Sequence, residues 1–122
     1  MLWDLKSDRP IYTQILEEMK KRIISGYYQP GEKLLAVREL AQEAKVNPNT
    51  MQKAMMELER EKLVFTVRTT GRYITEDIEL ITKTKKEFAT SHVENYYTQM
   101  KALGFNKSEM IEMLSGYEED KK

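Results

Sequence analysis

The stretch LLAVRELAQEAKVNPNTMQKAMMELEREKLVFTVRTTGRYIT, residues 34–75, decides the fold of this 122-residue chain. It contains two short helical patterns, a tight turn between them and a β-hairpin pattern directly after them. That order of elements is the plan of a winged helix-turn-helix, whose second helix enters the DNA major groove. The stretch therefore predicts a DNA-binding domain.

The first helical pattern places apolar residues at i, i+3, i+4 and i+7 from Val37 to Ala44, which gives one buried stripe. The turn that follows has the residues of a helix start. Asn47 is a suitable N-cap, because its side-chain oxygen can accept from free backbone N–H groups. Pro48 then stands at the first helical position, where a missing N–H costs nothing.

The second helical pattern repeats the apolar spacing from Met51 to Leu58. Its opposite face carries Asn49, Gln52, Lys53 and Met56. Asn and Gln can form paired hydrogen bonds with adenine edges, and Lys can contact guanine or phosphate. Residues 45–56 contain two lysines and no acid, whereas three acids follow in the C-terminal part of this helix. This distribution of charge along the helix suits an N-terminal end that faces DNA.

Residues 63–75 change from a helical period to the period of two that is typical of a strand. Thr69, Thr70 and Gly71 are expected to form the turn, with Gly71 able to adopt a positive φ. Lys62, Arg68 and Arg72 make the hairpin basic, and it contains no acid. A basic hairpin tip beside a groove-reading helix suits contact with the DNA backbone or minor groove.

Three further helices are predicted, over residues 10–25, over 78–103 and in a short segment after Asn106, which has capping-box spacing to Glu109. Two helices in the tail cannot bury their own apolar stripes, so we expect them to pack on the winged domain or on a second subunit. A dimer is favoured, because one recognition helix gives too little interface for tight specific binding. The apolar lead-in of Leu2, Trp3 and Leu5 is expected to pack on its own domain or on a partner chain.

Composition excludes several classes of function. There is no cysteine, so neither a disulfide framework nor a thiol nucleophile is possible. No apolar run approaches the length of a membrane span and no signal peptide is visible, so we expect a cytoplasmic protein without a membrane partner. The single histidine, His92, has no second His or Cys to complete a metal site. Without a nucleophile–base pair, a metal cluster or a phosphate loop, an enzyme is not expected, and no cofactor is predicted.

Charge is segregated along a chain whose formal net charge is zero. Residues 1–75 hold 13 Lys and Arg against 10 Asp and Glu, whereas residues 76–122 hold 7 against 10. The positive part is the part with the helix-turn-helix pattern, as DNA binding requires. The alternative left open is a winged helix used as a protein-interaction module without specific DNA affinity. The amide and lysine face of the second helix disfavours that alternative.

The stretch LLAVRELAQEAKVNPNTMQKAMMELEREKLVFTVRTTGRYI resembles the DNA-binding domain of the GntR family of bacterial transcription regulators. The NPNT turn, the PIYTQI start and the short tail resemble its YtrA-type subfamily. The resemblance implies a mainly α fold with a small β-hairpin wing (α+β). A winged helix-turn-helix in residues 1–75 would precede a two-helix C-terminal dimerisation tail in residues 76–122.

The resemblance also implies a function and a set of contacts. The protein would be a homodimeric repressor that binds a two-fold symmetric operator in double-stranded DNA, near an operon that often encodes an ABC transporter. The sequence does not indicate a small-molecule effector. The residues that would touch DNA are Arg38, Asn47, Pro48, Asn49, Thr50, Gln52, Lys53, Thr70 and Gly71, with the flanking Arg68 and Arg72. This chain differs from the usual family sequence at three places: it has Leu35-Ala36 in place of Pro-Ser, Lys53 in place of Arg, and Lys62 in place of Gly. These differences affect the operator sequence rather than the mode of binding.

Overall fold

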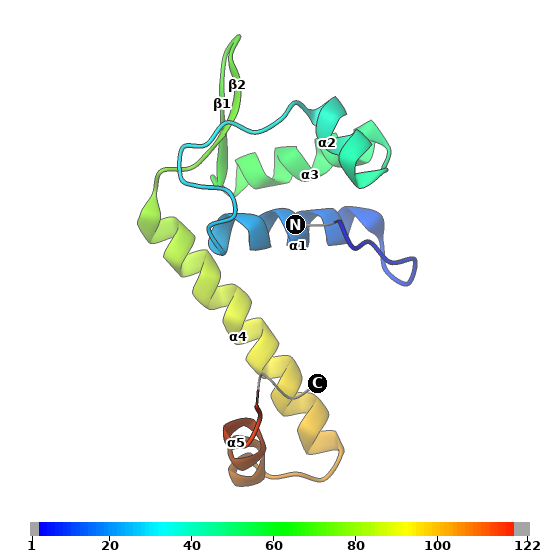
Figure 1. Cartoon of the computed structure of the whole chain (residues 1–122), viewed down its shortest axis with the longest axis vertical. Coiled ribbons are helices and arrows are strands. Elements are labelled where there is room, and N and C mark those ends of the chain that lie inside the picture. The colour runs from blue at the N-terminus through cyan, green and yellow to red at the C-terminus, as the bar shows by residue number, and fades with distance from the viewer. Residues whose placement is uncertain (1–2, 119–122) are drawn as a thin grey trace. The chain divides into compact units, whose positions relative to one another are not determined.

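The computed structural model describes residues 3–118, which form five helices and one antiparallel hairpin (Figure 1). The elements in chain order are α1 (Ile11–Ile24), α2 (Val37–Ala44), α3 (Pro48–Arg60), β1 (Val64–Val67), β2 (Gly71–Ile74), α4 (Ile78–Ala102) and α5 (Lys107–Ser115). The predicted fold class is confirmed: a winged helix-turn-helix is followed by two C-terminal helices.

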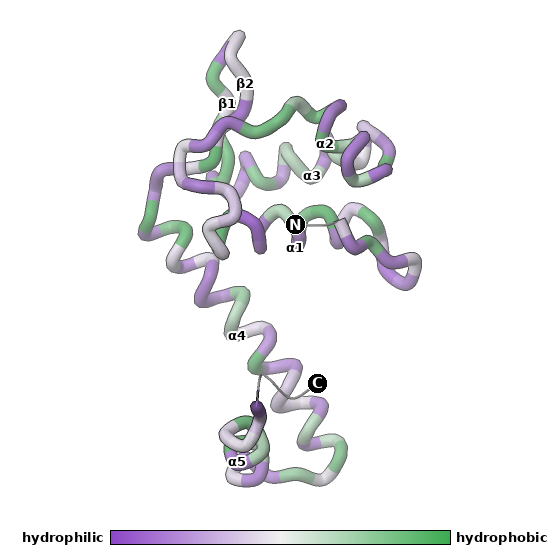
Figure 2. The backbone as a smooth tube through the Cα atoms, viewed as in Figure 1, coloured by the Kyte–Doolittle hydropathy of each residue, from purple (hydrophilic) through white to green (hydrophobic). Residues whose placement is uncertain are grey.

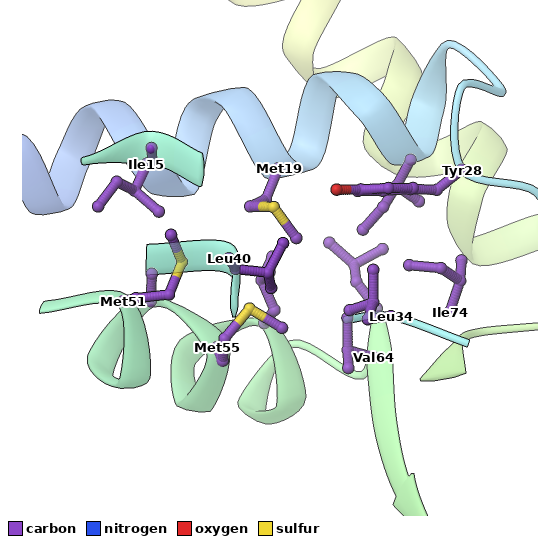
Figure 3. Packing of buried hydrophobic residues seen from close by; sticks show 14 of the residues in the cluster. Ile15, Met19, Tyr28, Leu34, Leu40, Met51, Met55, Val64 and Ile74 are labelled. Carbon is purple, nitrogen blue, oxygen red and sulfur yellow. The ribbon is translucent and has the colours of Figure 1, made fainter. Parts of the chain in front are cut away.

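The core of the DNA-binding part lies between α1, α2 and α3 (Figure 3). Ile15 and Met19 from α1 meet Met51 and Met55 from α3, with Leu40 of α2 beside them, and all five side chains are fully buried. Burying one such side chain stabilises the fold by about 1.5–3 kcal/mol. Hydrophobic and hydrophilic residues alternate along α1 and α3 in Figure 2, as a helix with one buried face requires.

The base of the hairpin completes this core. Val64 and Ile74 oppose each other across the two strands, and both are buried beside Leu34 and Tyr28 (Figure 3). The segment before α2 pairs with the outer edge of β2, because the Leu34 N–H donates to the carbonyl of Arg72 at 2.9 Å. The hairpin is thus fixed at its base, while its far end extends beyond the core.

The N-terminal arm packs on its own domain. Trp3 and Leu5 lie against the core, which answers the open question of where the lead-in packs; Leu2 is outside the described residues. Arg22 of α1 lies under this arm with its guanidinium carbon 4.1 Å from the centre of the Trp3 ring. The Arg22 side chain is also bonded to Glu18 at 2.9 Å and to the Tyr28 hydroxyl at 3.1 Å.

The chain divides into two compact units, residues 1–85 and 86–122, and the division falls within α4. In the second unit, Gly104 adopts φ 98° after α4, and Asn106 and Glu109 form the expected capping box at the start of α5. The Tyr96 hydroxyl donates to the carbonyl of Met110 at 2.9 Å, which ties the two helices together. Among the described residues, no helix is both long enough and apolar enough to span a membrane.

Candidate nucleic-acid interface

The start of α3 is built as its sequence predicts. Asn47 is the N-cap, in extended conformation, and its side-chain oxygen accepts from the Asn49 N–H at 2.7 Å. Pro48 occupies the first helical position. Asn47, Pro48 and Asn49 are exposed, and Thr50 is half-buried. The cap therefore fixes the first turn of α3 while leaving its polar atoms accessible to a ligand.

The two faces of α3 differ sharply in exposure. Met51, Ala54, Met55 and Leu58 are completely buried. On the opposite face Lys53 is exposed and Gln52 is half-buried, while Met56 is 57 % exposed although it is apolar. The helix thus presents amide and ammonium groups from a rigid support, which is what reading of base edges requires.

The acids at the C-terminal end of α3, including its C-cap Glu61, are each paired with a basic side chain. Glu57 bonds Arg60 of the same helix, Glu61 bonds Lys20 of α1 at 2.8 Å, and Glu59 bonds Arg72 of the wing. The hydrogen bonds from Arg60 and with Glu61 hold the pKa of Glu57 at about 2. These pairs offset the negative charge of the C-terminal half of α3, so that it repels DNA less.

The wing tip reverses the chain one residue earlier than expected. Strand pairing ends at Val67 and Gly71, so the loop consists of residues 68–70, and Gly71 belongs to β2. Gly71 does adopt a positive φ, 131°, as expected, and Thr69 also has a positive φ of 68°. Arg68 and Thr70 are exposed at this tip. Within the loop, Thr69 is the residue with a positive φ, and the Thr70 N–H donates to the carbonyl of Val67 at 3.1 Å, which closes the turn.

A left-handed Thr69 is strained, because its branched Cβ crowds the neighbouring carbonyl. We expect Thr69→Gly to stabilise the protein by about 1 kcal/mol, since relief of strain exceeds the entropy that glycine adds to the unfolded chain. The adjacent Thr70→Gly is the matched control, because no positive φ is found at Thr70, and it should destabilise the hairpin. Urea unfolding of both variants makes the comparison, and equal shifts in the two would contradict the strain at Thr69.

A groove of about 860 Å³ lies between the wing and the start of α2. Its lining comes from two segments distant in sequence, namely Lys33, Leu34, Leu35, Ala36, Val37 and Glu39, and Thr66, Val67, Thr69, Thr70, Gly71 and Arg72. A side chain at Gly71 would meet the Lys33 side chain, whose Cε lies 3.1 Å from the position of the added Cβ. The wing tip and the segment before α2 therefore form one surface.

Lys33 is a basic residue of this surface that sequence reasoning missed. It pairs with Tyr73 as an isolated β-bridge and is exposed. No local pattern could have placed it there, because its partner is 40 positions away in the chain. Arg38 is exposed in the first turn of α2, whose N-cap Ala36 offers no side-chain bond; the Glu39 carboxylate accepts from the Ala36 N–H instead, at 3.3 Å.

Arg72 differs in its surroundings from the other proposed contact residues. Its guanidinium is paired with Glu59, and the two side chains are 22 % and 32 % exposed. Burial raises the pKa of Glu59, but hydrogen bonds from Arg72 and Thr66 outweigh burial, and the pKa is lowered overall. Glu59 is consequently ionised at neutral pH.

Other residues singled out by sequence lie away from this surface. His92 is exposed in α4 with its ring 5.5 Å from that of Phe88. In the part of the chain that the structure describes, no three His, Cys, Asp or Glu side chains gather as a metal site requires.

A family model described as bacterial regulatory proteins, gntR family, matches residues 11–74. The chain belongs to the GntR family. Like the relatives reported below, this GntR protein is a transcriptional regulator with a DNA-binding domain, not an enzyme.

Two relatives in Bacillus subtilis (strain 168) support this assignment. The GntR protein is 39 % identical over 114 residues to the HTH-type transcriptional regulator YhcF, covering 93 % of this chain and 94 % of YhcF. It is 49 % identical over 74 residues to the HTH-type transcriptional repressor YtrA, covering 61 % of this chain and 57 % of YtrA. The resemblance to the YtrA-type subfamily is thereby supported.

Two solved structures share the fold of the GntR protein. A GntR family transcriptional regulator from Listeria monocytogenes superposes with a TM-score of 0.88 at 40 % identity, covering 93 % of this chain and all of that one. The DNA-binding domain of AraR in complex with operator ORE1 superposes with a TM-score of 0.52 at 28 % identity, covering 62 % of this chain and 94 % of that one.

Proposed function

We propose that this protein is a homodimeric repressor that recognises a two-fold symmetric operator through α3. The observation that carries the proposal is the polar, acid-free start of α3, held rigidly by a completely buried opposite face. YtrA is a repressor by name, and the AraR domain is bound to its operator. Blocking of a promoter is the simplest mechanism, and a nearby operon, such as one for an ABC transporter, is the proposed target. The proposed site of action is the cytoplasm, where bacterial DNA lies.

The proposed contacts fall into two groups. Asn49, Gln52 and Lys53 read bases, with Asn47, Pro48 and Thr50 at the cap against the backbone. The second group positions the protein on phosphates and consists of Arg38, Arg68, Thr70 and Gly71, to which the exposed Lys33 is added. Arg72 lies on the same surface, but its guanidinium is paired with Glu59, so it is not counted among the direct phosphate contacts. The DNA-binding part is proposed to end at residue 75.

The dimer is proposed to form through residues 76–122. In unit 86–122, Met110 is the one buried side chain among the described residues. Its exposed large apolar residues are Val93, Tyr97, Leu103, Ile111, Met113, Leu114 and Tyr117. An apolar surface of this kind on a small helical unit is typical of an interface between subunits. A second copy of this chain is the proposed partner at this surface, because a two-fold symmetric operator is bound by a two-fold symmetric dimer.

Base reading by α3 is tested with Gln52→Ala and Asn49→Ala. We expect each to cost about 1–3 kcal/mol on the specific site and much less on random DNA, because each removes a paired hydrogen bond to a base edge. Gln42→Ala is the control, since Gln42 is an equally polar, exposed amide on α2 outside the proposed interface. Affinity is measured on both DNAs at one salt concentration.

Equal losses on both DNAs would show that these side chains touch only the backbone. Unchanged binding in both α3 variants would remove α3 from the interface. A wild-type protein that binds neither DNA would favour the protein-interaction module instead.

A further inference from the structure

One carboxylate of α3, that of Glu59, contacts the wing between its buried base and its tip. Glu59 accepts a hydrogen bond from the Nε of Arg72 on β2. Thr66 and Arg72 are direct partners in the strand register. Glu59 therefore holds β2 directly, at the level of the Thr66–Arg72 strand pair.

This attachment lies close to the wing tip. Val67 and Gly71 are the next strand pair and the last one before the loop. The base of the hairpin is held differently, by the buried Val64 and Ile74. Between this base and the tip, the Glu59 carboxylate connects the wing to the recognition helix, while backbone bonds from residues 32–34 hold only the outer edge of β2.

The ion pair with Arg72 stabilises Glu59 in the folded protein, but the electrostatics of DNA binding disfavour an acid at this position. A carboxylate on a DNA-reading helix repels phosphate, and its pairing offsets the charge of a nearby arginine that could contact DNA directly. Both effects weaken DNA binding, unless the carboxylate has another role that strengthens it. Fixing the angle between wing and helix is such a role, because a rigid surface loses less entropy on binding.

We propose that Glu59 is a positioning residue for operator binding, which sets the wing tip relative to α3 through its ion pair with Arg72. The inference rests on the proposed DNA-reading function. It predicts an effect of opposite sign from electrostatics: removing this acid weakens binding, although removing an acid near DNA would otherwise strengthen it.

The test compares operator affinity for Glu59→Ala and Glu57→Ala. Glu57 is the matched control, because it is an acid of the same helix that is also paired with an arginine, but Arg60 lies on that helix and not on the wing. We expect Glu59→Ala to weaken operator binding about tenfold, within the range for residues in one hydrogen-bond network, and Glu57→Ala to bind as tightly as wild type or more tightly. Glu59→Gln, which still accepts a hydrogen bond, should recover part of the loss.

Arg72 supplies a second readout. Arg72→Ala should also weaken binding about tenfold, and the double variant with Glu59→Ala should show about the same loss rather than a hundredfold one, because both act through one contact. The dependence of affinity on salt should keep its slope in Arg72→Ala, whereas a direct phosphate contact would lower the slope by about one. Circular dichroism verifies the fold of every variant.

The proposal is overturned if the Glu59→Ala protein binds the operator as tightly as wild type or more tightly. It is also overturned if Arg72→Ala lowers the slope of affinity against salt and the losses of affinity in the double variant are additive. If Glu59→Ala does not fold, Arg72→Ala decides, and operator affinity unchanged from wild type in that variant overturns the proposal. Failure of the wild-type protein to bind any operator would instead defeat the proposed function.

Discussion

A chain ending at Lys85 should be monomeric and should bind a two-fold operator on the order of 10²–10⁴-fold more weakly than the full chain, because the avidity of two linked recognition units is lost. The cut follows the boundary between the two compact units. It keeps Leu80 and Ile81, which pack against the core of the DNA-binding part. The truncated chain should therefore stay folded, and sedimentation together with affinity measures both expectations.

Point substitutions in the full chain test the dimer interface without removing any residues. Leu114 of α5 is 66 % exposed, and Leu114→Asp should lower dimer stability in the full chain by placing a charge in an apolar interface. Ser108→Asp adds the same charge at an exposed polar position of α5 and should leave the dimer intact. A truncated chain that remains a tight dimer would place the interface in residues 1–85 instead.

Arg22→Met should destabilise the DNA-binding part by about 3 kcal/mol, because it removes a buried cation and leaves the partly buried Glu18 carboxylate unpaired. Arg22 is 2 % exposed, and the side chain of its partner Glu18 is 15 % exposed. Burial disfavours the charged guanidinium, but hydrogen bonds to Glu18 and Tyr28 outweigh burial and raise the pKa of Arg22. The substitution also removes the stacking on Trp3 that holds the N-terminal arm.

The control for Arg22 is the double variant Glu18→Gln/Arg22→Met. Removing the carboxylate as well should recover much of the lost stability, because no unpaired charge remains buried. Urea unfolding at neutral pH gives the free energy of unfolding for each variant. A double variant no more stable than Arg22→Met would show that Arg22 acts through its other contacts, among them Trp3 and Tyr28, rather than through the ion pair with Glu18.

Much of the fold could be predicted because its signals are local. The apolar spacing in α3 lies within two turns, and the Asn47 cap and Pro48 start are adjacent residues. The Asn106–Glu109 capping box spans a single turn. Such signals depend on the period of the helix and on free backbone groups, both of which can be read from a short window.

The missed features depend on contacts between distant segments. Lys33 reaches the wing through a bridge to Tyr73, and Arg72 is paired with a glutamate thirteen positions earlier. Strand register and helix packing decide both contacts, and no pattern within one element encodes them. The left-handed conformation of Thr69 was also missed, because a threonine does not indicate a positive φ and the neighbouring Gly71 does.

Selection of bound DNA from a random pool at one defined salt concentration tests the central claim most directly. If α3 of two subunits reads DNA, the enriched sequences should form an inverted repeat, with half-site centres about 10–10.5 bp apart or a multiple of that. The Gln52→Ala protein should lose the preference at one position in each half-site. A pool that shows no enrichment over its starting composition would contradict sequence-specific binding and leave the winged helix as a protein-interaction module.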